Sequence, residues 1–238
     1  MAKRVSWIAM LAAAALVAPA ASYAQLNLQQ FGFGGNKAEP AASGTNGAAQ
    51  PSALTSLVQN YLGANQQVLS GQSSLASSMG MTGVASQAQS AAGMLAGAAG
   101  SGGAGGLPSA SVLSQLGGTQ QSVSQSLMQA FTHGSSTPAS TGASKQAFTD
   151  GLASLGKGVS QYAGLQSDLG AVSNTMSMSS LLQAGSNPAT AQAATYIAQS
   201  APGQLQSLVS TLSQAVQYAK TNGIAVPAVA TSALSGVR

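Results

Sequence analysis

The sequence predicts an all-α protein, an irregular bundle of roughly six to eight helices that follows a signal peptide and a flexible linker. Apolar residues recur every three or four positions along most of the chain after residue 50, and this is the period of one helix face. No segment has the sustained two-residue alternation, bounded by turn signals, that a half-buried strand requires. Breaks rich in glycine and proline divide the helical pattern into separate segments.

The first 24 residues have the organisation of a secretory signal peptide. A basic start is followed by an apolar run, Val5–Ala18, and then by small residues at Ser22 and Ala24, so cleavage is expected between Ala24 and Gln25. The apolar run is shorter than the roughly 20 residues that a spanning helix needs, so we expect no transmembrane span in the mature chain. We therefore expect a bacterial exported protein, located in the periplasm or outside the cell.

The remaining chain divides into a linker and a helical domain. Residues 25–50 are rich in Gly, Ala, Ser, Asn and Pro and lack helical periodicity, which predicts a flexible linker. The helical domain is expected over residues 51–238. The glycine-rich break after residue 99 suggests a division into sub-halves at 51–99 and 109–238.

Two helices are expected in the first sub-half. The apolar face of the first consists of Leu54, Leu57, Val58, Tyr61, Leu62, Val68, Leu69, Leu75 and Met79. Gly63 and Gly71 weaken its middle, because an interior glycine costs up to about 1 kcal/mol relative to alanine. The second helix, Val84–Ala99, has a narrow face of small residues. It contains the G-x-x-x-G spacing at Gly93 and Gly97, from which we expect close helix packing inside the domain.

A third helix is expected to open at Pro108 and Ser109. Its apolar face consists of Val112, Leu116, Val123, Leu127 and Phe131. The pair Gly117-Gly118 lies in the middle of this face and predicts a kink or a break. A Ser/Thr/Gly/Pro-rich loop from His133 to Gly142 is expected to follow.

The strongest periodicity follows that loop, with spacings that alternate between four and three. It comprises Phe148, Leu152, Leu155, Val159, Tyr162, Gln166 and Leu169. This is the pattern of knobs-into-holes packing, and Ser144 is the expected N-cap of the helix. We expect the stripe to be core. In the alternative, an apolar groove for a lipid or a hydrophobic peptide is lined by Phe148, Leu152, Leu155, Val159 and Tyr162.

The C-terminal part is expected to contain several shorter helices. A short apolar segment ends at Gly185, Pro188 suits the first turn of the next helix, and Pro202 is expected to start another. The inner face of that last long helix consists of Leu205, Leu208, Val209, Leu212, Val216 and Ala219. Asn222-Gly223 should end it, because both residues tolerate the left-handed C-cap conformation. Residues 224–227 should be extended, before a final turn or two of helix.

The chain carries little charge, which excludes some functions. Charged residues make up 4% of the sequence, against about 25% in ordinary soluble domains. After the expected cleavage, the charged residues are Lys37, Glu39, Lys145, Asp150, Lys157, Asp168, Lys220 and Arg238. The cations are scattered singly, so we expect no nucleic-acid binding, which needs several of them on one face. Low charge weakens repulsion between molecules, so we expect a protein partner or self-association.

Catalytic, cofactor and metal sites have little support in the sequence. His133 lies in the expected loop, and Asp150 and Asp168 are far from it and from each other, so no triad or metal-ligand set is indicated. The chain has no cysteine, which removes thiolate chemistry. Residues 100–105 match G-x-G-x-x-G, but a helical stretch precedes them where a dinucleotide site needs a strand. We therefore expect no enzyme and no cofactor.

These observations predict a non-enzymatic exported helical protein with a structural or protein-interaction role in the periplasm, at the cell surface or in an extracellular matrix. The alternative is a periplasmic binding or carrier module that encloses an apolar ligand such as a lipid between its helices. The alternative depends on the apolar stripe from Phe148 to Leu169, together with the separate apolar face from Leu205 to Ala219.

Overall fold

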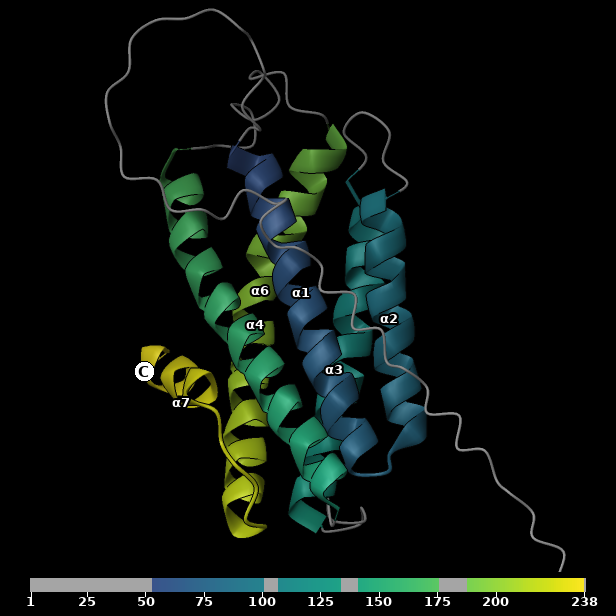
Figure 1. Cartoon of the computed structure of the whole chain (residues 1–238). Helices are drawn as coiled ribbons and strands as arrows, with labels where there is room; N and C mark the ends of the chain where they lie inside the picture. Colours follow the sequence, from purple (N-terminus) through teal and green to yellow (C-terminus); the bar gives the residue numbers. More distant parts are fainter. Residues whose placement is uncertain (1–52, 101–106, 134–140, 176–187, 238) are drawn as a thin grey trace, which may run out of the picture. The chain divides into compact units, whose positions relative to one another are not determined.

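Six α-helices and no strand make up residues 53–100, 107–133, 141–175 and 188–237, which are the residues that the computed structural model describes (Figure 1). The helices are α1 (Ala53–Ser78), α2 (Thr82–Gly100), α3 (Ala110–His133), α4 (Gly142–Thr175), α6 (Pro188–Thr221) and α7 (Ala228–Gly236). The all-α prediction is confirmed for these residues. The expected signal peptide, the linker at 25–50 and the short segment that ends at Gly185 lie outside them.

Helix α1 is central to the packing of the described helices. It runs along α4 and also contacts α2, α3 and α6, while α3 packs on α6 and α7 lies against α4 and α6 (Figure 1). All six helices contribute to one hydrophobic core. Residues of the two suggested sub-halves, 51–99 and 109–238, therefore share that core. None of the described helices is long and apolar enough to span a bilayer.

Glycines allow α1 and α4 to approach closely. A Cβ atom added at Gly71 would lie 2.6 Å from the backbone nitrogen of Leu155, and one added at Gly158 would lie 2.5 Å from Cγ2 of Val68. Both distances are far below van der Waals contact. The interior glycines lower the intrinsic stability of these helices, yet they are the positions at which the two helices meet.

The two glycines of the G-x-x-x-G spacing in α2 do not allow another helix of the described residues to approach closely. Gly93 and Gly97 are exposed, and a Cβ atom at either position would meet no neighbouring atom within 4 Å. The prediction that this spacing packs closely inside the domain is therefore wrong for the described residues. The small residues of α2 that do pack, such as Ala88 and Ala91, lie on a different face of the helix.

The predicted seam of α4 is buried as far as Tyr162 and then changes position. Leu165 is 1% exposed and continues the buried face, whereas the predicted seam residue Gln166 is exposed. An α-helix drifts relative to a strict seven-residue repeat, so a neighbouring position can replace a seam position after a few turns. The apolar Leu165 takes the buried place, and the amide of Gln166 faces water.

The N-terminus of α4 is capped by Thr141. The prediction that Ser144 is the N-cap is therefore wrong. The Thr141 hydroxyl accepts a hydrogen bond from the backbone N–H of Ser144 at 3.1 Å, and the two hydroxyl groups lie 2.8 Å apart. A threonine before the first helical residue can satisfy the amide of the third residue of the helix. Ser144 occupies that third position, so α4 begins before it.

Helix α6 continues through Pro202, contrary to the prediction that a new helix starts there. A proline inside a helix removes the bond to the carbonyl four residues earlier and costs about 3 kcal/mol. Pro202 is itself exposed, while Ile197, Ala201 and Leu205 are buried on the core side of the same helix. Packing on both sides of the proline stabilises one continuous helix.

The end of α6 agrees with the sequence prediction. Gly223 has a φ of 62°, and the N–H of Ile224 donates to the carbonyl of Ala219 at 2.8 Å. The N–H of Gly223 also donates to the carbonyl of Lys220 at 3.4 Å, which completes a Schellman motif. Residues 224–227 have no regular secondary structure before α7, and Pro227 has the predicted extended conformation, with a φ of −68° and a ψ of 144°.

Candidate functional site

Four polar side chains form a cluster in the core where α1, α3, α4 and α6 meet. The hydroxyl groups of Tyr61 and Tyr162 each lie 2.9 Å from Oε1 of Gln204 and donate to it. Tyr162 also lies 3.5 Å from Oε1 of Gln120, a weaker contact, because one hydroxyl proton serves one good bond at a time. We call Tyr61, Gln120, Tyr162 and Gln204 the tyrosine–glutamine cluster.

Both tyrosines of the cluster are held in the neutral form. Removal from water raises the pKa of Tyr61 above its ordinary value of 10.0, and the neighbouring Tyr196 raises it further, while the Gln204 hydrogen bond acts in the opposite direction. Removal from water also raises the pKa of Tyr162 well above 10.0, with a further contribution from Tyr61. The two hydroxyl groups are therefore protonated donors at neutral pH.

A cavity of about 480 Å³ opens beside this cluster, between α3 and α6. Four glutamines, four serines, three glycines, Tyr196 and Leu208 line it. We call it the α3–α6 pocket. None of its lining residues is charged, and its volume is within the range of about 300–1,000 Å³ that is usual for small-molecule sites.

Gly117 lets two side chains of α6 approach the backbone of α3. A Cβ atom at Gly117 would lie 2.6 Å from Nε2 of Gln204 and 2.6 Å from the hydroxyl oxygen of Tyr196. Helix α3 runs without interruption through Gly117-Gly118, so the predicted break is absent. The helix tolerates the pair because the residues around it are packed, with Leu113, Leu116 and Gln120 all buried.

Polar groups at the wall of the pocket have no partner within the described residues. Nε2 of Gln120 and the hydroxyl of Ser200 are both buried and make no hydrogen bond. Gln120 as a residue is 2% exposed. A buried polar group without a partner costs about 1–3 kcal/mol, so these two groups lower the stability of the protein unless something binds to them.

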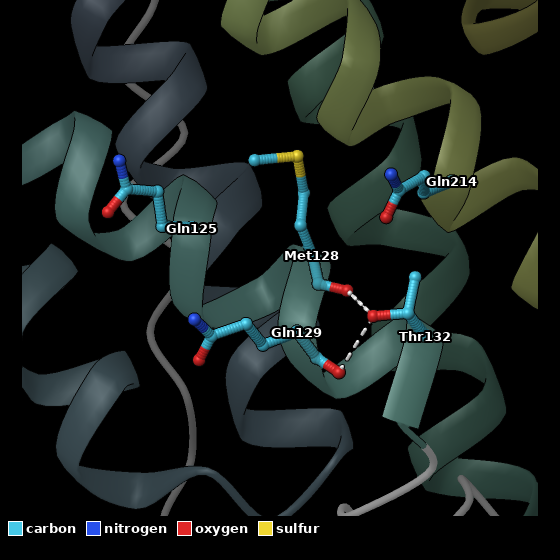
Figure 2. Close-up of a pocket in the computed structure, with 5 residues that line it drawn as sticks. All are labelled: Gln125, Met128, Gln129, Thr132 and Gln214. Carbon is cyan, nitrogen blue, oxygen red and sulfur yellow. Dashed lines mark hydrogen bonds between the residues drawn. The ribbon is translucent and has the colours of Figure 1, made fainter.

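A smaller cavity of about 220 Å³ lies farther along the same two helices and is shown in Figure 2. The hydroxyl of Thr132 donates to the carbonyl of Met128 at 2.8 Å, and the carbonyl of Gln129, 3.2 Å away, is a weaker second acceptor, so the hydroxyl proton is satisfied within α3. The Met128 side chain extends between Gln125 and Gln214 (Figure 2). Oε1 of Gln214 is buried and has no hydrogen-bond partner among the residues that the structure describes. This second cavity is also uncharged.

The residues proposed from the sequence to line an apolar groove are brought together in the core. Phe148, Leu152, Leu155, Val159 and Tyr162 are each 0% exposed, and none of them lines either of the two cavities described above. Phe148 packs on the rings of Phe131 and Tyr218, whose centroids are 6.1 Å and 5.4 Å from its own.

The titratable residues considered from the sequence are not brought together. His133 is exposed at the end of α3, and Asp150 is exposed in α4, where Nε2 of Gln146 donates to its Oδ1 at 2.9 Å. The side chain of Asp168 lies outside the described residues. Within the described ranges, no group of three or more His, Asp or Glu side chains is placed to hold a metal ion.

The sequence interpretation missed the tyrosine–glutamine cluster, because glutamine in a helix usually faces water. One signal for it was available. Gln120 lies within the apolar series Leu113, Leu116, Gln120, Val123 and Leu127, whose spacings alternate between three and four. A polar residue at such a seam position is expected to be buried and to need a hydrogen-bonding partner.

Comparisons with known proteins give no match to a protein-family model, to a curated protein or to a solved structure. No function can therefore be transferred to this chain from a relative. The α3–α6 pocket, the cluster beside it and the outer helix faces are the features from which a function can be inferred.

Proposed function

We propose that this is a non-enzymatic exported helical protein with a structural or protein-interaction role in the periplasm, at the cell surface or in an extracellular matrix. One observation carries the proposal. Helices α1, α2 and α3 contact one another and contain no Lys, Arg, Asp or Glu between them. Their exposed residues are mainly Ser, Gln, Thr, Gly and Ala, together with Met94 of α2 and His133 at the very end of α3.

A surface of this kind favours association for two physical reasons. Charged groups keep soluble proteins apart, and their absence removes that repulsion. Charged groups are also depleted from the cores of protein interfaces, because burying them costs more free energy than burying amides or hydroxyls. An uncharged face that can form hydrogen bonds is therefore suited to contact with another protein surface.

Helix α2 is the clearest example of such a face. Ser86, Gln87, Ser90 and Gly93 are exposed on it, and Met94 is 41% exposed, the one large hydrophobic side chain that is exposed in the part of the chain described. A Cβ atom added at Gly93 would meet nothing within 4 Å, so the helix backbone at this position is open to close approach by another molecule. We therefore place the expected contact on this face of α2.

Export is tested first, by fractionating the producing cell and sequencing the N-terminus of the recovered protein. The proposal expects the protein outside the cytoplasm, with Gln25 as its first residue. Recovery of the intact chain from the cytoplasm would contradict this part of the proposal.

Association is then tested by size-exclusion chromatography with light scattering over a wide range of protein concentration. We expect assemblies that grow with concentration. Replacing two exposed residues, Ser86→Lys with Ser90→Lys, should weaken this assembly at low salt, because the added charges repel each other across the contact. The matched control is Ser160→Lys with Gln161→Lys, which adds the same charge to exposed positions of α4. A compact monomer at every concentration would contradict self-association.

The carrier for an apolar ligand stays as the alternative. It requires apolar side chains that face a cavity, and the five residues proposed for that role are buried among other core residues. Lipid that copurifies with the protein, identified by mass spectrometry, would support this alternative.

A further inference from the structure

We propose that the α3–α6 pocket binds a neutral, polyhydroxylated ligand, that is, an uncharged saccharide, through Gln120, Ser200 and the residues around them. This inference goes beyond the proposed function, which requires no small ligand. It also concerns a different part of the molecule from the proposed protein contact, since the pocket is lined by residues of α3 and α6 and not by the uncharged face of α2.

The chemistry of the lining argues for a neutral and polar ligand. An ion would find no counter-charge in the pocket, and burying an unpaired charge is costly. An apolar ligand would contact Leu208 but would cover the amides and hydroxyls of the other walls without giving them partners. A sugar hydroxyl both donates and accepts hydrogen bonds, as do the Gln and Ser side chains that dominate the lining.

Two residues that line the pocket each have a buried polar group with no hydrogen-bond partner among the described residues. Within the described part of the chain, Nε2 of Gln120 is a donor without an acceptor, and the hydroxyl of Ser200 has neither a donor nor an acceptor partner. A ligand hydroxyl placed against each of them would satisfy both, and this would recover the free energy lost by burying them. A site built to hydrogen-bond a hydroxyl also discriminates strongly against a ligand that lacks it.

The cluster behind the pocket holds its wall in a fixed arrangement. Oε1 of Gln204 accepts from both Tyr61 and Tyr162, so the amide cannot rotate without breaking two bonds of 2.9 Å. Its Nε2 consequently lies on the side of Gly117, at the pocket. Groups that are already oriented before binding lose little conformational entropy when a ligand arrives.

The glycines and one aromatic residue suit a flat ring. Gly118 and Gly203 leave the walls open at two positions, where an added Cβ atom would meet nothing within 4 Å, so a ring can approach the helix backbone there. Tyr196, which is partly buried, adds an aromatic surface whose hydroxyl is close to Gly117. Aromatic side chains with a polar end combine apolar contact with a hydrogen bond.

The test uses the full mature protein and a panel of neutral sugars, namely glucose, maltose, cellobiose and chitobiose. Binding is measured by saturation-transfer NMR and by calorimetry. We expect binding of at least one sugar, weakened about tenfold or more by Gln120→Leu and by Ser200→Ala, since each removes one hydrogen bond that only the ligand satisfies. The matched controls are Gln89→Leu in α2 and Ser210→Ala in α6, which change exposed residues away from the pocket and should leave binding unchanged.

A structural role for Gln120 is separated from a binding role by thermal unfolding of the same variants without ligand. We expect Gln120→Leu to unfold at the same or a higher temperature, because it removes a buried donor that has no partner in the described ranges. Loss of sugar binding together with retained stability would support the proposal. It would be overturned by failure of all four sugars to bind at millimolar concentration, by binding that Gln120→Leu leaves unchanged, or by binding only of an uncharged Ser/Gln/Gly peptide added in their place.

Discussion

Tyr61 of α1 and Tyr162 of α4 pack edge to face, with ring centroids 5.7 Å apart and an interplanar angle of 70°, and both hydroxyls donate to the same oxygen of Gln204 in α6. Three helices are thus joined at one point in the core. An offset or perpendicular ring pair contributes about 0.5–1.5 kcal/mol beyond the burial of its area. The shared acceptor also links the position of α6 to that of the α1–α4 pair, because moving any one helix breaks a buried hydrogen bond.

Gln204→Leu should destabilise the protein strongly. The substitution leaves two buried tyrosine hydroxyls without their acceptor, and each such loss costs about 1–3 kcal/mol. We expect the free energy of unfolding, measured by urea denaturation followed by circular dichroism, to fall by about 2–5 kcal/mol. Gln206→Leu, an exposed position of the same helix, should change it by less than about 0.5 kcal/mol. Equal effects of the two variants would mean that the cluster adds no stability.

The protein should lose stability in alkaline solution. Burial raises the pKa of Tyr61 and Tyr162 in the folded protein, so above pH 10.0 the unfolded chain ionises first and is favoured. The stability linked to the two hydroxyls is therefore fully present below pH 10.0 and is lost as the pH rises through the raised values. Unfolding free energies measured between pH 8 and 12 should show this fall, and the double variant Tyr61→Phe, Tyr162→Phe should show much less of it. A fall of the same size in the double variant would assign the alkaline loss to other groups.

Stability should by contrast be nearly independent of pH in acid. Acid unfolding mostly follows from protonating carboxylates that have partners in the native state. The sequence has only three acidic residues, and Asp150 is exposed, with a hydrogen bond to Gln146 of its own helix. Circular dichroism should show helix content retained from neutral pH to about pH 3. A sharp loss of helix above that pH would contradict this expectation.

Two glycines of α4 should respond in opposite directions to replacement by alanine. A methyl group at Gly151 would lie 2.9 Å from Cγ of Leu75 and 3.0 Å from the carbonyl oxygen of Gly71, so Gly151→Ala should cost about 1–3 kcal/mol through overpacking. A methyl group at Gly164 would meet nothing within 4 Å. Gly164→Ala should therefore stabilise the protein by up to about 1 kcal/mol through helix propensity. Thermal unfolding of both variants measures the difference, and similar melting temperatures would mean that α4 shifts to accept the methyl group at Gly151.

The positions of the helices could be predicted from the sequence, because a helix that packs on a core repeats its apolar residues with its own period. The stripe from Phe148 to Tyr162 is buried as its spacing predicted. Asn222-Gly223 ends α6, because the left-handed conformation at Gly223 is a local property that needs no distant contact. The period of the apolar residues and the residues that end a helix were sufficient to predict these features.

Other features were decided only by the tertiary structure. Pro202 is a helix breaker by local rules, yet packing of the buried residues on either side of it holds α6 together. Gly71 in α1 and Gly158 in α4 each weaken an isolated helix. They are needed only because α1 and α4 pack so closely that a Cβ atom at either position would clash with the other helix. The candidate site belongs to this second class, since Gln120 and Gln204 lie on different helices and meet the two tyrosines only when four helices assemble. Local sequence determines which backbone each segment favours, whereas the partners of a buried polar group are determined by contacts between segments far apart in the chain.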